Sequence, residues 1–214
     1  MNLLIAAALG FLLGSIPFGL ILTSAAGLGD VRKIGSGSIG ATNVLRTGNK
    51  WLALGTVLLD AGKGVAAVLI ARAFFPGTEG IAAVGAVAGH CYTPWLKFKG
   101  GKGFATAAGV CGALSWPLML ACAGVWVACV ALFRISSVAS LASVSFAAVA
   151  TFLAPFLGFE ALAPLFLPML AIQVIVVIKH NENIKRLLAG QEPKIGSSPK
   201  PAASDPAASE AESQ

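Results

Sequence analysis

Residues 3–25 read LLIAAALGFLLGSIPFGLILTSA and contain no charged side chain. An α-helix needs about 20 mostly apolar residues to cross the hydrocarbon core of a bilayer, so this run is long enough for one crossing. No basic segment precedes it, and it is longer than the apolar part of a secretory signal peptide. The opening of the chain therefore predicts a membrane-spanning helix rather than a cleaved leader.

Six further apolar segments follow, at residues 51–74, 80–96, 104–114, 117–133, 138–157 and 161–178. Of the 214 residues, 57% are hydrophobic and 11% are charged, which is more apolar surface than one water-soluble core could bury. A soluble enzyme, a disordered protein and a disulfide-stapled secreted module are thereby excluded. We expect an all-α integral membrane protein with seven transmembrane helices, although segment 104–114 is short for a simple crossing.

The distribution of basic residues predicts the orientation of these helices. Of the 15 Lys and Arg residues, all but Lys63 and Arg72 lie in the segments that follow the first, third, fifth and seventh helices. Basic residues are enriched in cytoplasmic loops of membrane proteins. We therefore expect the N-terminus outside and the C-terminus in the cytoplasm. The net charge of +6 is explained by this placement and does not indicate a nucleic-acid partner.

The composition divides the chain into two parts. Residues 1–195 hold all seven apolar segments and are expected to form one membrane domain. Residues 196–214 are dominated by Ser, Pro, Ala and Glu and have little that could bury an apolar face. They are expected to form a disordered cytoplasmic tail.

A first polar loop, GSGSIGATNVLRTGNK at residues 35–50, follows the first helix. Its candidate site residues are Gly35, Ser36, Gly37, Gly40, Asn43 and Arg46. The three glycines have a dinucleotide-binding spacing, but no strand or βαβ unit surrounds them, so that interpretation fails. Glycines let backbone N–H groups approach an anion, and an Arg guanidinium suits oxyanions. The loop predicts a phosphate or carboxylate site, with a flexible re-entrant turn as the alternative.

A second polar segment, KFKGGKG at residues 97–103, lies between the third and fourth helices; we call it the glycine loop. Gly100, Gly101, Lys102 and Gly103 stand immediately before a predicted helix start, where unpaired N–H groups and the helix dipole favour anions. The alternative is a basic anchor at the membrane surface, which explains Lys97 and Lys99 but not the glycines around Lys102. A phosphate cradle is therefore predicted.

A third polar segment begins where the seventh helix ends, with His180 and Asn183. These two residues share one face if the helix continues, and His180 could act as an acid or base near neutral pH. A histidine at a membrane border is also a common interfacial anchor. Two other polar segments on the same side favour a site.

Other polar residues lie within the predicted helices. Asp60 and Lys63 are three positions apart in the second helix, and we expect them to pair and orient the bundle, because intramembrane charges are costly alone. His90 is expected to be a buried histidine with satisfied hydrogen bonds. Ser137 and Ser140, at the start of the sixth helix, could either pack against a neighbouring helix or present a hydroxyl to the site.

At these three polar segments the sequence resembles the PlsY family of bacterial acyl-phosphate:glycerol-3-phosphate acyltransferases. The matching stretches are GSGSIGATNVLRTGNK (35–50), GHCYTPWLKFKGGKGFAT (89–106) and HNENIKRLLAGQEPKI (180–195). The resemblance implies a seven-helix enzyme of the bacterial inner membrane with its site facing the cytoplasm. It also implies transfer of an acyl chain from acyl phosphate, not acyl-CoA, to the 1-hydroxyl of sn-glycerol 3-phosphate. Lysophosphatidic acid and phosphate are the implied products. The enzyme is expected to contact membrane lipid, and no cofactor is implied.

The resemblance also implies roles for individual residues. Its active-site serine and arginine fall on Ser36 and Arg46, its phosphate loop on the glycine loop, and its histidine and asparagine on His180 and Asn183. A structural glutamate falls on Glu192. The hydroxyl of the sixth helix is shared among Ser136, Ser137 and Ser140, and Ser38 replaces the asparagine that is commoner in the first motif.

The sequence allows two proton acceptors and more than one function for its cationic segments. The proton of the attacking hydroxyl could be accepted by His180 or by a phosphate oxygen of a substrate. An anion transporter could use the same cationic segments, although a carrier needs polar groups near the membrane midplane, where only Asp60 and Lys63 qualify. A lipid phosphotransferase is disfavoured, because the sequence lacks the clustered aspartates that would hold its metal.

Overall fold

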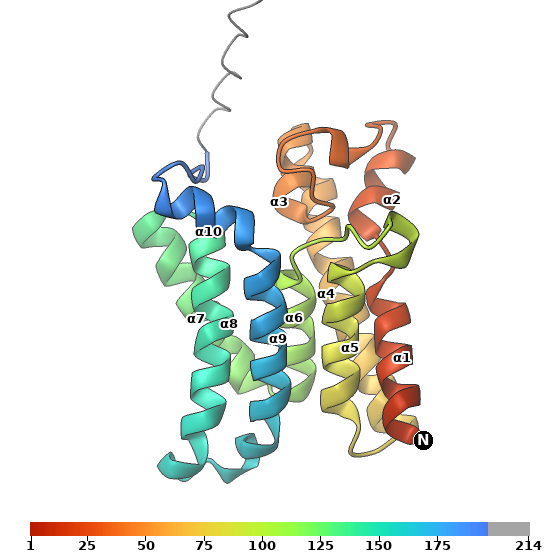
Figure 1. Ribbon diagram of the computed structural model, residues 1–214, viewed down its shortest axis with the longest axis vertical. Helices are drawn as coiled ribbons and strands as arrows, with labels where there is room; N and C mark the ends of the chain where they lie inside the picture. The colour runs from red at the N-terminus through yellow and green to blue at the C-terminus, as the bar shows by residue number, and fades with distance from the viewer. Residues whose placement is uncertain (197–214) are drawn as a thin grey trace, which may run out of the picture.

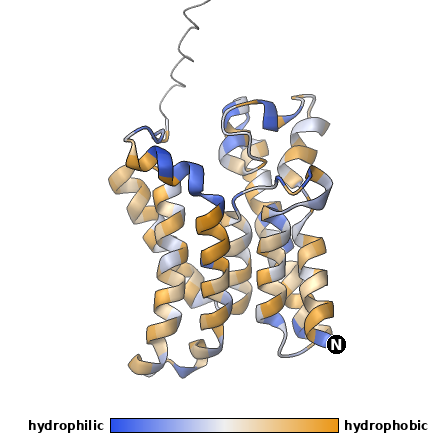
Figure 2. Cartoon of the chain, viewed as in Figure 1, coloured by the Kyte–Doolittle hydropathy of each residue, from blue (hydrophilic) through white to orange (hydrophobic). Residues whose placement is uncertain are grey.

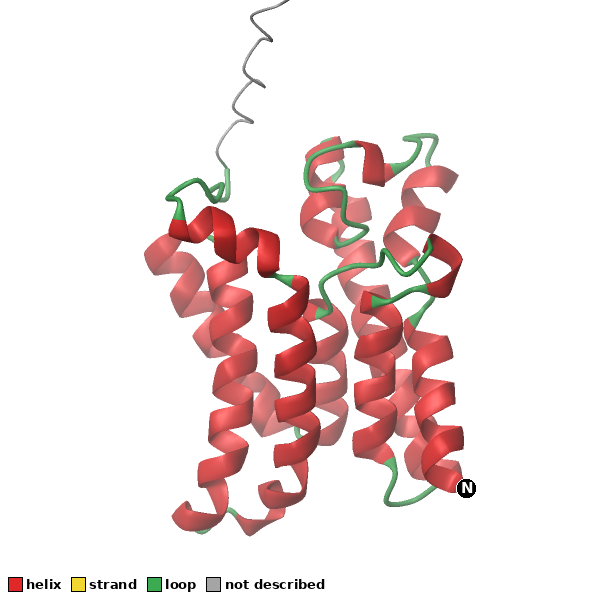
Figure 3. Cartoon of the chain, in the orientation of Figure 1, coloured by secondary structure: helices red, strands yellow, loops and turns green. Residues whose placement is uncertain are grey.

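A computed structural model describes residues 1–196, and within that range the only regular elements are helices (Figures 1 and 3). The α-helices are α1 (Asn2–Gly14), α2 (Phe18–Ala25), α3 (Ala41–Val44), α4 (Lys50–Phe74), α5 (Glu79–Cys91), α6 (Phe104–Leu114), α7 (Trp116–Phe133), α8 (Ser136–Leu153), α9 (Phe166–Lys179) and α10 (Asn181–Leu188). Short 3₁₀ turns are η1 (Val31–Lys33), η2 (Leu45–Thr47), η3 (Pro94–Leu96), η4 (Ala154–Leu157) and η5 (Glu160–Leu165). The predicted tail, apart from Gly196, lies outside the described residues.

The first predicted helix is interrupted. Expected as one element over residues 3–25, it is divided into α1 and α2 around Pro17. Proline has no N–H and its ring collides with the preceding turn, so the α-helical ladder cannot continue through it. The Ser15 hydroxyl donates to the Leu12 carbonyl at 2.7 Å, which helps to end α1.

Every other predicted apolar segment contains a helix, but their lengths differ. Within residues 1–196, five helical segments are long and apolar enough to cross a membrane: Asn2–Ala25, Lys50–Phe74, Trp116–Phe133, Ser136–Leu157 and Glu160–Lys179. Helices α5 and α6 are shorter, at 13 and 11 residues. Over residues 1–196 the chain is therefore an all-helical membrane protein.

Small residues set the packing of the helices. Gly10 and Gly14 on α1 lie against the backbone of Ala82 and Ala86 on α5, so closely that a Cβ on either glycine would overlap it. Such close backbone approach is typical of helix contacts in membranes, where shape and not water exclusion drives association.

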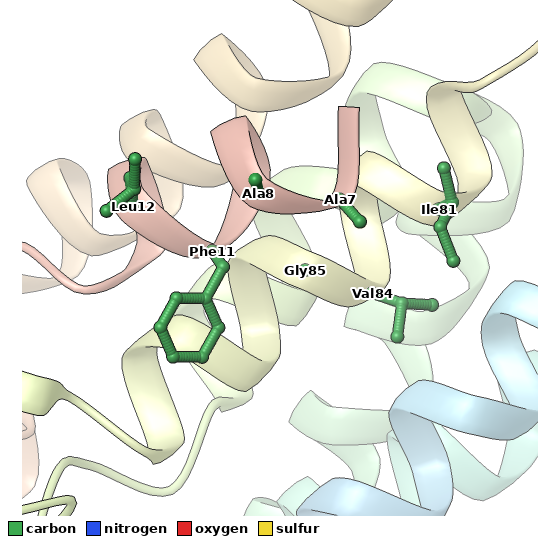
Figure 4. Close-up of a pocket in the computed structure, with 7 residues that line it drawn as sticks. All are labelled: Ala7, Ala8, Phe11, Leu12, Ile81, Val84 and Gly85. Carbon is green, nitrogen blue, oxygen red and sulfur yellow. The ribbon is translucent and has the colours of Figure 1, made fainter. Parts of the chain in front are cut away.

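Large apolar side chains lie on the outside of the bundle. Leu132 is 75% exposed and Phe156 is 78% exposed, as expected of residues that face lipid. Between α1 and α5 runs an open apolar groove lined by Ala7, Ala8, Phe11, Leu12, Ile81, Val84 and Gly85 (Figure 4).

Polar segments gather at one end of the bundle. Figure 2 shows hydrophilic residues at the end that carries α3 and α10, whereas the N-terminus lies at the opposite end. The last described residues also lie at the polar end (Figure 1). The three segments singled out in the sequence thus share one side of the molecule.

Candidate active site

The first polar loop is wound around the side chain of Asn43, which is 1% exposed. Its amide nitrogen donates to the carbonyls of Val31 and Ser38, at 2.8 Å each, and to that of Ile34 at 3.1 Å. Its oxygen accepts from the Ser36 N–H at 3.0 Å. The sequence predicts a phosphate contact for Asn43, but these bonds give its amide the task of holding the loop.

Gly35 makes room for Arg46. Gly35 has φ +54°, and a Cβ there would overlap the Arg46 guanidinium and the Asn43 side-chain oxygen. Arg46 donates from Nη1 to Asn43 Oδ1 at 3.3 Å, and its side chain is otherwise exposed. Ser36 is exposed beside it. The loop therefore presents one guanidinium and one hydroxyl on a preorganised backbone.

The glycine loop lies on the C-terminal end of α5. The N–H of Gly101 donates to the His90 carbonyl at 3.0 Å, and that of Gly100 donates to the Cys91 carbonyl at 3.3 Å. A Cβ on Gly103, which has φ +89°, would press on the Cys91 thiol. The sequence predicts these N–H groups at a phosphate, but two of the three glycines donate theirs to α5, because helix-end carbonyls need donors.

Lys97, Phe98 and Lys99 of the glycine loop are exposed, and Lys102 is half-buried just before the start of α6. Gly103 is the N-cap of α6, and no side chain caps this end among the described residues. Burial, the largest cause, and the charges of Arg186 and Arg46 together lower the pKa of Lys102 to about 8, against the opposing charge of Glu192. An ammonium beside an uncapped helix N-terminus is suited to hold a phosphate group.

His180 occupies the corner between α9 and α10. Its Nδ1 lies 2.8 Å from the Val176 carbonyl, so Nδ1 carries a proton and the lone pair of the neutral ring is on Nε2. The side chain is buried, and burial lowers its pKa, which favours the neutral ring at pH 7. His180 can therefore accept a proton or a hydrogen bond through Nε2.

Glu192 ties the third polar segment together. Its Oε1 accepts from the Asn183 amide and from the Ser137 hydroxyl, the latter at 2.8 Å. Its Oε2 accepts from Arg186 Nε at 2.8 Å. Burial alone would raise the pKa of Glu192, but the hydrogen bonds from Asn183, Ser137 and Arg186 outweigh it and hold the pKa below the usual value. These bonds join the third polar segment to the start of α8.

The serines at the start of α8 are now distinguished. Ser137 and Ser140 are both buried, at 5% and 4% exposure, but of the two only Ser137 donates to Glu192. Asn183 is also buried, and its side-chain oxygen has no hydrogen-bond partner among the described residues. An unpaired buried oxygen of this kind is costly unless something supplies a donor, so it marks Asn183 as a candidate ligand contact.

The three polar segments form one electrostatic region. The pKa of Lys102 responds to Arg46 of the first segment and to Arg186 and Glu192 of the third. The pKa of His180 in turn responds to Lys102 and Glu192. Arg186 is a cation that the sequence did not single out, although its position one turn after Asn183 on a helix was a usable signal.

The intramembrane residues form a separate cluster. Asp60 and Lys63 make the predicted ion pair, with Oδ1 and Nζ 2.7 Å apart, and His90 is buried beside them. No group of three His, Cys, Asp or Glu residues in the range 1–196 is arranged to hold a metal ion.

These features define a class of protein: an all-helical membrane protein that carries guanidinium, ammonium, imidazole and amide groups at one end of its bundle. The chain belongs to the glycerol-3-phosphate acyltransferase family, whose model matches residues 4–190.

Relatives and solved structures agree with this assignment. A glycerol-3-phosphate acyltransferase of Mesorhizobium japonicum is 56% identical over 195 residues, which cover 91% of this chain and 97% of that protein. One of Erythrobacter litoralis is 53% identical, covering 91% and 96%. The crystal structure of PlsY (YgiH), an integral membrane glycerol 3-phosphate acyltransferase, in its glycerol 3-phosphate form is 34% identical with a TM-score of 0.82, covering 92% of this chain and 96% of that one. Its lysophosphatidic acid form is 33% identical with a TM-score of 0.81 and the same coverage.

Proposed function

We propose that the protein transfers a fatty acyl chain from acyl phosphate to the 1-hydroxyl of sn-glycerol 3-phosphate. The products are lysophosphatidic acid and inorganic phosphate. The observation that carries the proposal is that the segments bearing Arg46, Lys102 and Arg186 share one end of an apolar bundle, where the charges of both arginines lower the pKa of Lys102. The similar PlsY structures in glycerol 3-phosphate and lysophosphatidic acid forms support the acceptor and the product.

The reaction requires two phosphate-bearing molecules to meet at one carbonyl. The acceptor oxygen bonds to the acyl carbon, the bond from that carbon to the phosphate oxygen breaks, and the hydroxyl proton passes to a base. Because a mixed anhydride already has a good leaving group, no covalent enzyme intermediate is needed. The protein's task is to overcome the repulsion between two anions and to align them, which cations on a rigid backbone achieve.

Each polar segment has a part in this proposal. Arg46 and Ser36 hold one phosphate on the loop that Asn43 organises. Lys102 and the N-terminus of α6 hold the other. Asn183 offers an unpaired side-chain oxygen to a substrate hydroxyl. Nε2 of His180 and a substrate phosphate oxygen are the two candidates for the proton acceptor.

We also propose that the site faces the cytoplasm of a bacterial inner membrane, in a seven-span arrangement with the N-terminus outside. Two observations support this orientation. Most basic residues belong to segments at the polar end of the bundle, and the N-terminus lies at the opposite end. In a cysteine-free background, Lys33→Cys should resist a membrane-impermeant maleimide in intact cells, whereas Glu160→Cys should react. The reverse labelling would contradict this orientation.

The donor is tested directly with purified protein and labelled glycerol 3-phosphate. Lysophosphatidic acid should form with acyl phosphate and not with acyl-CoA. Product from acyl-CoA alone would overturn the donor assignment. No product from either donor, together with uptake of label into sealed vesicles, would favour the anion transporter.

A further inference from the structure

Three ionisable side chains are buried together inside the bundle and are not part of the exposed polar loops. Asp60, Lys63 and His90 are 1%, 5% and 3% exposed. Lys63 Nζ lies 2.7 Å from Asp60 Oδ1, 2.9 Å from His90 Nδ1 and 2.8 Å from the Ile16 carbonyl. The ammonium thus donates to His90 Nδ1 and to the Ile16 carbonyl and is ion-paired with Asp60, so it joins α4, α5 and the break between α1 and α2.

A buried ionic cluster of this kind contributes little net stability to helix packing. Desolvating the charges offsets much of their attraction, and apolar side chains of similar volume often stabilise as well or better. The neighbouring helix contacts use glycine and alanine instead, as at Gly10 against Ala82 and Gly109 against Ala61. The position of the cluster therefore calls for a reason other than packing.

That position is directly beneath the glycine loop. Because Lys63 donates to His90 Nδ1, the ring proton of neutral His90 lies on Nε2. Nε2 in turn lies against Gly101, where a Cβ would overlap it. The backbone carbonyl of His90 accepts from the Gly101 N–H at 3.0 Å. The side chain and the backbone carbonyl of His90 thus both contact Gly101, the residue that precedes Lys102.

We propose that His90 is a positioning residue for the glycine loop. Lys63 and Asp60 hold its ring in one tautomer and orientation, the ring and carbonyl seat Gly101, and Gly101 determines where Lys102 and the start of α6 meet a phosphate. The proposal deepens the proposed function and rests on it. It assigns the intramembrane charges to the site instead of to bundle stability.

The test compares variants that change the contact between the His90 ring and Gly101 with a variant that only destabilises the bundle. His90→Asn keeps an acceptor for Lys63 but is too short to reach Gly101. His90→Gln restores an amide near the position of Nε2. The matched control is Ser143→Ala, which removes another buried bond, from the Ser143 hydroxyl to the Cys122 carbonyl at 2.9 Å, remote from the loop.

For each variant, KM for glycerol 3-phosphate and for acyl phosphate, kcat and the unfolding temperature in detergent are measured. Binding of glycerol 3-phosphate is measured separately, from the rise of the unfolding temperature with ligand. His90→Asn should raise KM for at least one phosphate substrate by about ten- to a hundredfold, because small displacements at a site have effects of that order. His90→Gln should recover most of that loss, and Ser143→Ala should leave KM unchanged.

If His90→Asn keeps both KM values within twofold of wild type, or if Ser143→Ala raises them equally, the proposal is overturned. Gly101→Ala serves if His90→Asn does not fold, because it keeps all three side chains of the Asp60–Lys63–His90 cluster while its Cβ overlaps His90 Nε2, and it should give the same rise in KM. Wild-type protein that binds glycerol 3-phosphate without transferring an acyl chain would overturn the proposed function alone. The binding comparison among the variants would then still decide the role of His90.

Discussion

Glu192 accepts a hydrogen bond from the Ser137 hydroxyl at 2.8 Å, across 55 residues of chain. This bond joins the start of α8 to the segment that follows α10. Asn183 and Arg186, both within α10, donate to the same carboxylate. One side chain thus sets the position of the third polar segment relative to the bundle.

Replacing Glu192 with Ala should be costly, because it leaves Arg186 and Asn183 without their acceptor. The Glu192 side chain is 7% exposed but its partner Arg186 is 36% exposed, so water compensates part of the loss and the change should cost about 2 kcal/mol. Ser137→Ala is the matched control, because it removes one of the bonds and should cost about 1 kcal/mol. Equal unfolding temperatures for the two variants would contradict this account of Glu192.

The same carboxylate predicts a loss of stability in acid. The pKa of Glu192 in the folded protein lies below its usual value of 4.5, so the folded state holds this proton less tightly than the unfolded state. The stabilisation is complete above pH 4.5 and is lost as the pH falls through the folded pKa. The unfolding temperatures of wild type and Glu192→Gln, measured in detergent, should converge as the pH is lowered below the pKa of Glu192 in the folded protein.

Lys102 predicts the behaviour of substrate affinity in alkali. Since its pKa is lowered to about 8, the ammonium is lost as the pH rises through that value, well before an ordinary lysine would titrate. KM for the phosphate held by Lys102 should then rise, by up to about tenfold per pH unit. Lys102→Arg should remove this slope, because a guanidinium stays charged. A flat wild-type profile from pH 7 to about 9.5 would contradict phosphate binding by a Lys102 of lowered pKa.

Arg46 should matter for turnover and not for folding. Its guanidinium is exposed and makes a 3.3 Å bond to Asn43, so Arg46→Ala should change the unfolding temperature little. Loss of a cation that stabilises a developing phosphate charge should lower kcat/KM about a hundredfold or more. Arg32→Ala is the control, because Arg32 pairs with Asp30 on the surface and should leave activity within about twofold. Similar losses in both variants would indicate a general effect of surface charge.

Gly35 should be required for the placement of Arg46. Gly35→Ala introduces a Cβ that overlaps Arg46 and Asn43, at a residue with φ +54°. Gly48→Ala is the control, because Gly48 also has positive φ but open space around it. Both variants carry the left-handed backbone cost of about 1–2 kcal/mol. Assays of kcat/KM alongside unfolding temperature should show a large loss of activity for Gly35→Ala alone.

Much of the fold is determined locally and is readable from the sequence. Apolar runs in a chain with 11% charged residues must become membrane helices, because only a helix satisfies its own backbone in lipid. The ion pair between Asp60 and Lys63 is also local, since three positions on a helix bring two side chains together. Pro17 was a usable signal for the break in the first helix.

The tertiary structure decided which donor meets which acceptor. The sequence marks Gly100 and Gly101 as residues that can approach an anion, but only the fold brings α5 carbonyls to their N–H groups. It likewise brings His90 to Lys63 across 27 residues and Ser137, rather than Ser140, to Glu192. Residue type and spacing determine what a side chain can do. Which partner it finds depends on contacts between distant segments, because these alone satisfy its buried polar atoms.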